Sequence, residues 1–232
     1  MRLIFSIKSI FKTLLIIAFM LIVASIAGQM MKYVFGHPTV HGLVPLFDVS
    51  QEQNIPTLFS VLLLTICSIL LCVAFYFDHK QAAGLKMYWA TLAAGFTYLA
   101  VDEFAELHEK FGLSVRPFMG EYLHGFFYYS WVVPALAMVL FLSIFYSSFL
   151  FKLPKIIRIN FIIAAIIYVT GLIGIEMLGG NYHELNGSEN LTYSMITTLE
   201  ESLEMLGLIL FIRALLNYLF AQYSELSIHI KS

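Results

Sequence analysis

The chain has 232 residues, of which 60% are hydrophobic and only 12% are charged, whereas soluble domains are about half apolar and a quarter charged. This composition excludes an ordinary soluble domain, and the 21 Phe and 13 Tyr residues exclude a disordered chain. Two cysteines are too few for a disulfide scaffold. The net charge of −2 gives no reason to expect a nucleic-acid partner.

Six apolar stretches are each long enough to cross a bilayer as a helix, which requires ~20 residues. They lie at roughly 12–34, 57–77, 86–107, 124–150, 159–179 and 194–219. The run from Leu58 to Phe77 contains no charge and does not alternate polar with apolar residues, as a barrel strand would. The sequence therefore predicts an all-α polytopic membrane protein, a bundle of six transmembrane helices that forms a single domain over residues 1–232.

The first apolar stretch has two interpretations. Basic residues precede it, and Ser25-Ile26-Ala27 resembles a cleavage site, so it could be a secretory signal that leaves five spans in the mature protein. The apolar run continues to Val34, beyond the usual length of a signal core. We therefore expect an uncleaved membrane anchor.

The Lys and Arg residues are distributed unequally between the segments that connect the spans. With the N-terminus inside, nine fall on the cytoplasmic side: Arg2, Lys8, Lys12, Lys80, Lys86, Lys152, Lys155, Arg158 and Lys231. Only Lys32, Lys110 and Arg116 fall on the outer side, and Arg213 lies near the inner end of the last span. Because cytoplasmic loops are enriched in Lys and Arg, we predict that both termini are cytoplasmic. The compact, loop-poor design suggests a multi-pass protein of a bacterial inner membrane, with the outer side facing the periplasm.

The acidic residues have the opposite distribution, because only Asp78 and Glu225 of the fifteen are expected on the cytoplasmic side. Three predicted spans carry acids at their outer ends: Asp102, Glu103 and Glu109 at the third, Glu176 at the fifth, and Glu200, Glu201 and Glu204 at the sixth. A charge deep in a spanning helix costs ~2.5–3.5 kcal/mol, so these carboxyl groups must be protonated, hydrated or neutralised by a cation. Since all lie at one predicted depth, we expect them to share a site. A small rotation of the last helix decides whether Glu200 or Glu201 faces inward.

Histidines on the same side complete a possible metal-ligand set, because imidazole and carboxylate together suit Zn, Fe or Mn. The predicted ligands of one or more such divalent ions are His108, Glu109, Glu176, Glu200 and Glu204. The predicted proton-transfer groups are Asp102, Glu103 and Glu201. A helix that stays regular through 102–109 would turn His108 away from the stripe that holds Asp102 and Glu109. His183 and Glu184 are expected to follow a helix break at Gly179-Gly180-Asn181.

Three functions are consistent with this pattern. The first is a metal-dependent membrane enzyme, either a hydrolase or an oxidase, that acts on a lipid or lipid-like substrate at the outer side of the bundle. The second is a carrier coupled to a divalent cation or to protons, since acids within the membrane often mark ion paths. The third is a non-catalytic accessory or scaffold subunit. The zincin pattern His-Glu-x-x-His is absent, and no motif in the sequence defines a reaction, a substrate or an oligomeric state.

Overall fold

The computed structural model describes residues 6–81, 84–119 and 123–222, and these form helices and connecting turns without any strand. The helices are α1 (Ile7–Tyr33), η1 (Val40–Gly42), α2 (Leu43–Phe47), α3 (Ile55–Gln81), α4 (Lys86–Ala105), α5 (Leu107–Met119), η3 (Gly125–Phe127), α6 (Val132–Lys152), α7 (Lys155–Val169), η4 (Thr170–Ile175), α8 (Glu176–Asn186) and α9 (Leu191–Gln222). Arg2, Glu225 and Lys231, which the sequence assigns to the cytoplasmic side, lie outside the described residues.

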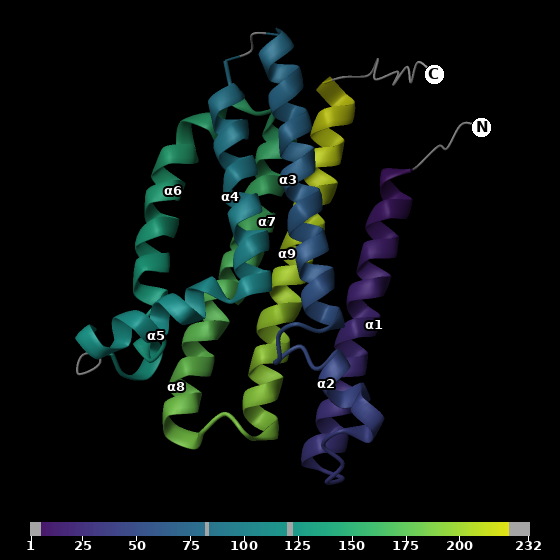
Figure 1. The fold of residues 1–232 in the computed structure, drawn as a ribbon. Coiled ribbons are helices and arrows are strands. Elements are labelled where there is room, and N and C mark those ends of the chain that lie inside the picture. Colours follow the sequence, from purple (N-terminus) through teal and green to yellow (C-terminus); the bar gives the residue numbers. More distant parts are fainter. Residues whose placement is uncertain (1–5, 82–83, 120–122, 223–232) are drawn as a thin grey trace.

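The long helices run side by side in alternating directions, with α9 near the middle of the bundle, α1 along one edge and α6 along the other (Figure 1). α5 runs across the bundle where α4 ends, and α7, η4 and α8 follow one another as one continuous helical stretch. The beginning of α1 and the end of α9 lie at the same end of the bundle. We call this the terminal end, and the opposite half, which contains α2 and α8, the distal half.

Five helical stretches among the described residues are long and apolar enough to cross a membrane: Ile7–Tyr33, Ile55–His79, Val132–Lys152, Lys155–Asn186 and Leu191–Gln222. The chain is therefore consistent with a multi-pass membrane protein. α4, which corresponds to the predicted third span, does not meet the same criterion. Its 20 residues include Lys86, Asp102 and Glu103, and these charges lower its mean hydropathy.

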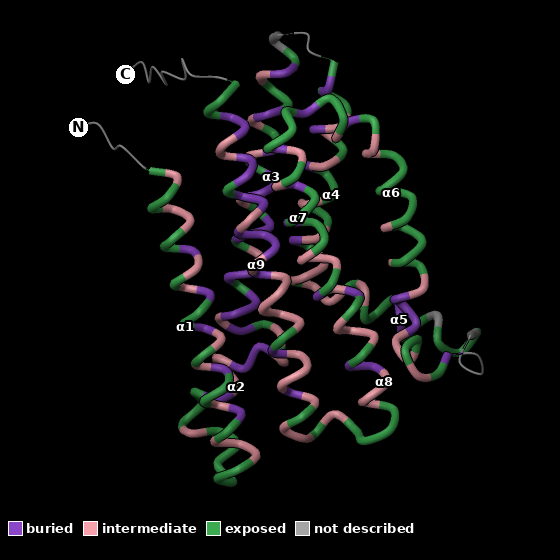
Figure 2. Tube along the Cα trace, turned by 180° about the vertical axis from the view of Figure 1, so that it is seen from behind, coloured by how far each residue is buried: buried purple, intermediate pink, exposed green. Residues whose placement is uncertain are grey.

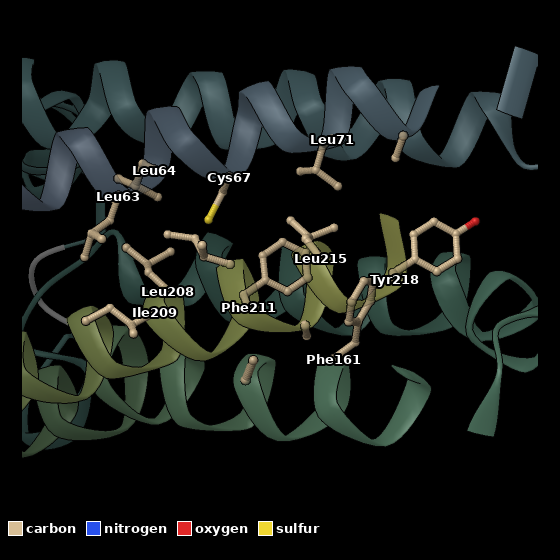
Figure 3. Close-up of a cluster of buried hydrophobic side chains, with 14 of the residues drawn as sticks. Leu63, Leu64, Cys67, Leu71, Phe161, Leu208, Ile209, Phe211, Leu215 and Tyr218 are labelled. Atoms are coloured by element: carbon tan, nitrogen blue, oxygen red, sulfur yellow. The ribbon is translucent and has the colours of Figure 1, made fainter. Parts of the chain in front are cut away.

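The terminal half of the bundle is filled by an apolar core. Figure 3 shows side chains of α3, α7 and α9 packed together, among them Leu63, Cys67, Phe161 and Leu215. Leu63, Cys67 and Leu215 are fully buried. α6, in contrast, is exposed over most of its length (Figure 2), as expected for a helix that faces lipid rather than protein.

Three differences from the predicted helices bear on the candidate site. α4 ends at Ala105 because Glu106 adopts a left-handed conformation (φ 53°), which starts α5 in a new direction. The predicted fourth span begins at Val132 rather than at residue 124, since Gly125 (φ 61°) and a short 3₁₀ turn occupy the first residues. No break occurs at Gly179-Gly180-Asn181, because α8 continues to Asn186. Gly180 instead allows close packing, since a Cβ there would lie 2.9 Å from the Tyr129 ring.

Candidate functional site

A cavity of about 470 Å³ lies in the distal half of the bundle. Its lining includes every residue that the sequence analysis singled out: Asp102, Glu103, His108, Glu109, Glu176, Glu200, Glu201 and Glu204. These residues come from α4, α5, α8 and α9, so side chains that are up to about a hundred positions apart in the sequence face one space. Glu200 and Glu201 both line the cavity, although the sequence suggested that only one of them would face inward.

His108 is held in place by Asp102. The Asp102 carboxylate accepts a hydrogen bond from the His108 backbone N–H at 2.8 Å, and its second oxygen lies 2.9 Å from His108 Nδ1. The His108 ring also packs edge-on against Trp131, with ring centroids 4.8 Å apart. The helix does not stay regular from 102 to 109, because the left-handed residue Glu106 ends it, and His108 therefore faces Asp102.

The contact with Asp102 decides which ring nitrogen of His108 is available to a ligand. When Nδ1–H donates to the carboxylate, Nε2 keeps its lone pair, which is the arrangement of histidines that bind metals. Burial lowers the pKa of His108, but the hydrogen bond and the charge of Asp102, together with the charges of Glu109 and Glu52, outweigh this effect and raise the pKa overall.

Glu52 completes a group of three ligand-type side chains that the sequence analysis did not identify. One oxygen each of Glu52 and Glu109 and one ring nitrogen of His108 all lie within 4.8 Å of one another. Glu52 Oε2 is buried without a hydrogen-bond partner among the described residues. Burial, and then the negative charges of Glu103 and Glu109, raise the pKa of Glu52 from 4.5 to about 8.

The segment that carries Glu52 is fixed by buried polar contacts with α1. Asp48 is 2% exposed, and its carboxylate accepts hydrogen bonds from the Gln29 amide and from the Ser50 hydroxyl (2.6 Å). The Val49 N–H donates to the buried Ser25 hydroxyl at 3.1 Å. These contacts tie the segment to the distal end of α1.

Asn54 closes the same segment and begins the next helix. Its amide donates to the carbonyl oxygens of Asp48 (2.6 Å) and Gln51 (2.8 Å), and its side-chain oxygen accepts from the Thr57 N–H at 3.2 Å. This last bond satisfies a free N–H at the start of α3, as a helix N-cap does. The segment is thus an ordered element of the site.

A π-helical turn directs Glu176 toward α9. The turn η4 covers Thr170–Ile175, where the Thr170 hydroxyl donates to the Ile166 carbonyl at 2.7 Å. Such turns are often found at functional sites, because they change the direction of the side chains that follow. Trp131 Nε1–H donates to Glu176 Oε1 at 3.1 Å, and the Glu176 and Glu200 carboxyl groups are in hydrogen-bonding contact. Two carboxyl groups in such contact need a proton or a cation between them.

Two glycines permit α9 to approach α7 and η4 closely. A Cβ on Gly171 would lie 2.8 Å from the Glu200 carbonyl oxygen. A Cβ on Gly207 would lie 2.7 Å from Tyr168 Cβ. Both distances are too short for real contacts, so a side chain at Gly171 would separate η4 from α9, and one at Gly207 would separate α7 from α9.

The cavity lining also includes aromatic and basic side chains. The Tyr129 hydroxyl lies 2.8 Å from His183 Nδ1 and 2.7 Å from the Tyr193 hydroxyl. Arg116 stacks on the Tyr128 ring at 4.4 Å, and Lys32 pairs with Glu189 at 3.1 Å. His183 therefore contacts a tyrosine network rather than the Glu52–His108–Glu109 group.

Comparison with known proteins gives a family for the chain but no described activity. No curated protein and no solved structure matches it. A protein-family model described as a domain of unknown function, DUF8692, matches residues 13–219, which is most of the sequence. The chain therefore belongs to the DUF8692 family.

Proposed function

We propose that this protein is a metal-dependent membrane enzyme that hydrolyses a lipid or lipid-like substrate, with its metal held by Glu52, His108 and Glu109. The observation that carries the proposal is the close grouping of these three side chains in the cavity. Two carboxylates and one imidazole suit Zn, Fe or Mn. Three protein ligands leave a coordination position open, as in catalytic zinc sites. Such an ion would act as a Lewis acid on a substrate oxygen.

The donor set fits a metal in two further respects. Glu52 Oε2 is buried and accepts no hydrogen bond from any described residue, and a cation would satisfy it. The Asp102 carboxylate is within hydrogen-bonding distance of His108 Nδ1. Carboxylates make the same contact with the non-coordinating ring nitrogen of metal-binding histidines. We therefore assign Asp102 a positioning role, in place of the proton-transfer role expected from the sequence.

The other cavity acids have supporting roles in this proposal. Glu103 and Glu201 line the cavity beside the proposed metal site, and we retain them as candidate proton-transfer groups. Glu176, Glu200 and Glu204 lie outside the Glu52–His108–Glu109 group. Their role as ligands remains a prediction, and it requires a second ion in the same cavity. The number of ions bound per chain therefore distinguishes a one-metal hydrolytic site from a two-metal site.

An enzyme that acts from one side of the membrane accounts for the packing better than a carrier does. The buried side chains that α3, α7 and α9 contribute to the core of the terminal half are mostly apolar (Figure 3), whereas the acids of the proposed site line the cavity of the distal half. Carriers place their sites near the midplane and need access from both sides. We propose a lipid or lipid-like substrate because the apolar side chains of Leu99, Leu113 and Leu172 line the cavity together with the acids.

We propose a location in a bacterial inner membrane with six crossings, both termini cytoplasmic and the cavity on the periplasmic side. The basic residues at the starts of α1 and α7 and at the end of α6 support this orientation, since all lie at the terminal end of the bundle (Figure 1). α4 would supply the sixth crossing, with its charged distal end facing the cavity.

Metal analysis of the purified full chain tests the proposal. The protein is purified without chelators, and bound metals are measured by plasma mass spectrometry for the wild type, Glu52→Gln and His108→Ala. We expect about one Zn, Fe or Mn ion per chain in the wild type and its loss in both variants, since each removes one of three ligands.

Glu189→Gln is the matched control, because Glu189 also lies at the cavity but pairs with Lys32 instead of joining the ligand group. It should retain the metal. A wild-type protein without metal, or variants that keep it, would contradict the proposal. Cation- or proton-dependent flux in liposomes without bound metal would instead favour the carrier.

A further inference from the structure

A second pocket, of about 140 Å³, lies between α7 and α9 and shares no lining residue with the large cavity. Its lining residues are Asn160, Ile163, Leu210, Arg213, Ala214 and Asn217. One basic and two amide side chains thus meet on two helices that are otherwise mostly apolar at this level. The pocket belongs to the terminal half of the bundle, since Asn160 follows the start of α7 and Asn217 precedes the end of α9.

Arg213 carries a charge that no acid neutralises within the part of the chain that the structure describes. None of the ion pairs there includes Arg213, although it lies on a helix that is apolar enough to span a membrane. Its guanidinium stacks on the Phe11 ring of α1 at 4.5 Å, and no carboxylate of a described residue pairs with it. A cation at such a position needs an anion from outside the chain or contact with lipid headgroups.

The two asparagines add hydrogen-bond donors to this charge. Asn217 lies four residues after Arg213, so both side chains project from one face of α9. Asn160 faces them from α7. Neither amide forms a side-chain hydrogen bond with another described residue. A guanidinium with two free amides matches a group that has several acceptor oxygens and a negative charge, such as a phosphate.

The position of the pocket favours a lipid phosphate over a free ion. At a rise of ~1.5 Å per residue, Asn160 lies about 8 Å from the start of α7, and Arg213 lies about 14 Å from the end of α9. The Arg213 side chain is long enough to reach from there toward the headgroups. Large exposed apolar residues continue from the pocket along α7, where acyl chains would lie: Ile159, Ile162, Ile163 and Ile166. Basic pockets between spanning helices are known to bind anionic headgroups.

We infer that this pocket binds the phosphate group of an anionic phospholipid in the leaflet at the terminal end of the bundle. Arg213 provides the charge, Asn160 and Asn217 provide hydrogen bonds, and Ile163 and Leu210 contact the acyl chains. The inference depends on the chain spanning a membrane and is independent of the proposed enzymatic site, because the two pockets have no residue in common.

Native mass spectrometry of the detergent-purified chain tests this inference, with phosphatidylglycerol and phosphatidylcholine added in equal amounts. The wild type should retain one phosphatidylglycerol with a preference of roughly tenfold or more over phosphatidylcholine, as a charge-assisted contact predicts. Arg213→Gln should lose this preference, and Asn217→Leu should weaken it. A melting temperature measured for each variant verifies that it is folded.

Arg158→Gln is the matched control. Arg158 is another arginine in the terminal half, on α7, but it lies outside the pocket and stacks on Phe151 at 5.1 Å. It should keep the wild-type preference. Equal lipid retention by the wild type and Arg213→Gln, or an equal loss in Arg158→Gln, would overturn the inference. Displacement of the lipid by millimolar inorganic phosphate would also overturn it, because the pocket would then be a site for a free anion.

Discussion

The chemistry of the large cavity depends on how individual side chains are held. The bond between His108 Nδ1 and Asp102 fixes one ring orientation, and the buried Asp48 fixes the segment that presents Glu52. Residues that touch no ligand are therefore expected to influence binding at the site. Asp102 offers the clearest test, because its two oxygens accept from two different N–H groups of His108.

Asp102→Asn should weaken metal binding by about 10–100-fold without preventing folding. The new amide N–H₂ would face Nδ1 and favour the tautomer with its proton on Nε2, which removes the lone pair that a metal needs. Competition with a chelating dye measures the affinity. Glu106→Gln is the control, since Glu106 accepts a bond from Gln53 at the surface. An unchanged affinity in Asp102→Asn would show that Asp102 does not position His108.

The metal-free protein should lose stability as the pH rises from about 5 to 8. Glu52 has a pKa of about 8 in the folded state against 4.5 for an unperturbed carboxyl group. In this pH range the folded state therefore binds more protons than the unfolded state, and stability falls as the pH rises. Melting temperatures of the metal-free wild type and of Glu52→Gln, measured across this range, provide the test. The variant should show a flatter profile, and identical profiles would contradict the assignment.

At the level of the helices, the site depends on the contact between the π-turn and α9. The turn changes the direction of Glu176, and Gly171 allows the Glu200 backbone to come close. The segment contains a second glycine in a different environment. A Cβ on Gly174 would lie 3.7 Å from Thr170 Cγ2, which is an ordinary contact within the same helix.

Gly171→Ala should therefore destabilise the protein by about 1–3 kcal/mol, as overpacking does, whereas Gly174→Ala should have little effect. The two variants add the same methyl group to the same helical turn, so intrinsic helix propensity cancels in the comparison. Thermal unfolding in detergent measures both. Equal melting temperatures for the two variants would show that the turn and α9 are not in tight contact.

At the level of the whole molecule, the terminal half of the bundle holds most of the apolar core and the distal half contains an acid-lined cavity. The basic residues at the ends of the helices surround the terminal half, whereas the acids gather in the cavity. This asymmetry predicts which half faces the cytoplasm.

Cysteine labelling tests the predicted orientation, in a background in which the exposed Cys72 is replaced by serine. Ser188→Cys lies between α8 and α9 at the distal end of the bundle, and Lys155→Cys lies at the terminal end. A membrane-impermeant maleimide should label Ser188→Cys in intact cells but should label Lys155→Cys only after the membrane is permeabilised. The reverse pattern would invert the proposed topology, and labelling of both in intact cells would contradict it.

The sequence by itself determined the features that depend on composition and local pattern. Long charge-free runs predicted apolar helices of spanning length, because burial of apolar side chains in a bilayer requires that length. The free-energy cost of placing charges in such helices identified Asp102, Glu103, Glu176, Glu200, Glu201 and Glu204 as candidate site residues. All of them line one cavity. The number of crossings remains a prediction, since α4 is less apolar than the other long helices.

Only the tertiary structure decided which side chains form the closest group. Glu52 lies in an irregular segment without periodicity, so nothing local indicates that it meets His108 and Glu109. The turn at Glu106 depends on a left-handed backbone conformation that its residue type does not favour, and it brings His108 to Asp102, where a regular helix would have turned it away. Contacts between segments that are distant in the sequence stabilise such conformations. A local sequence pattern shows only which residues are neighbours along the chain, so it does not reveal these contacts.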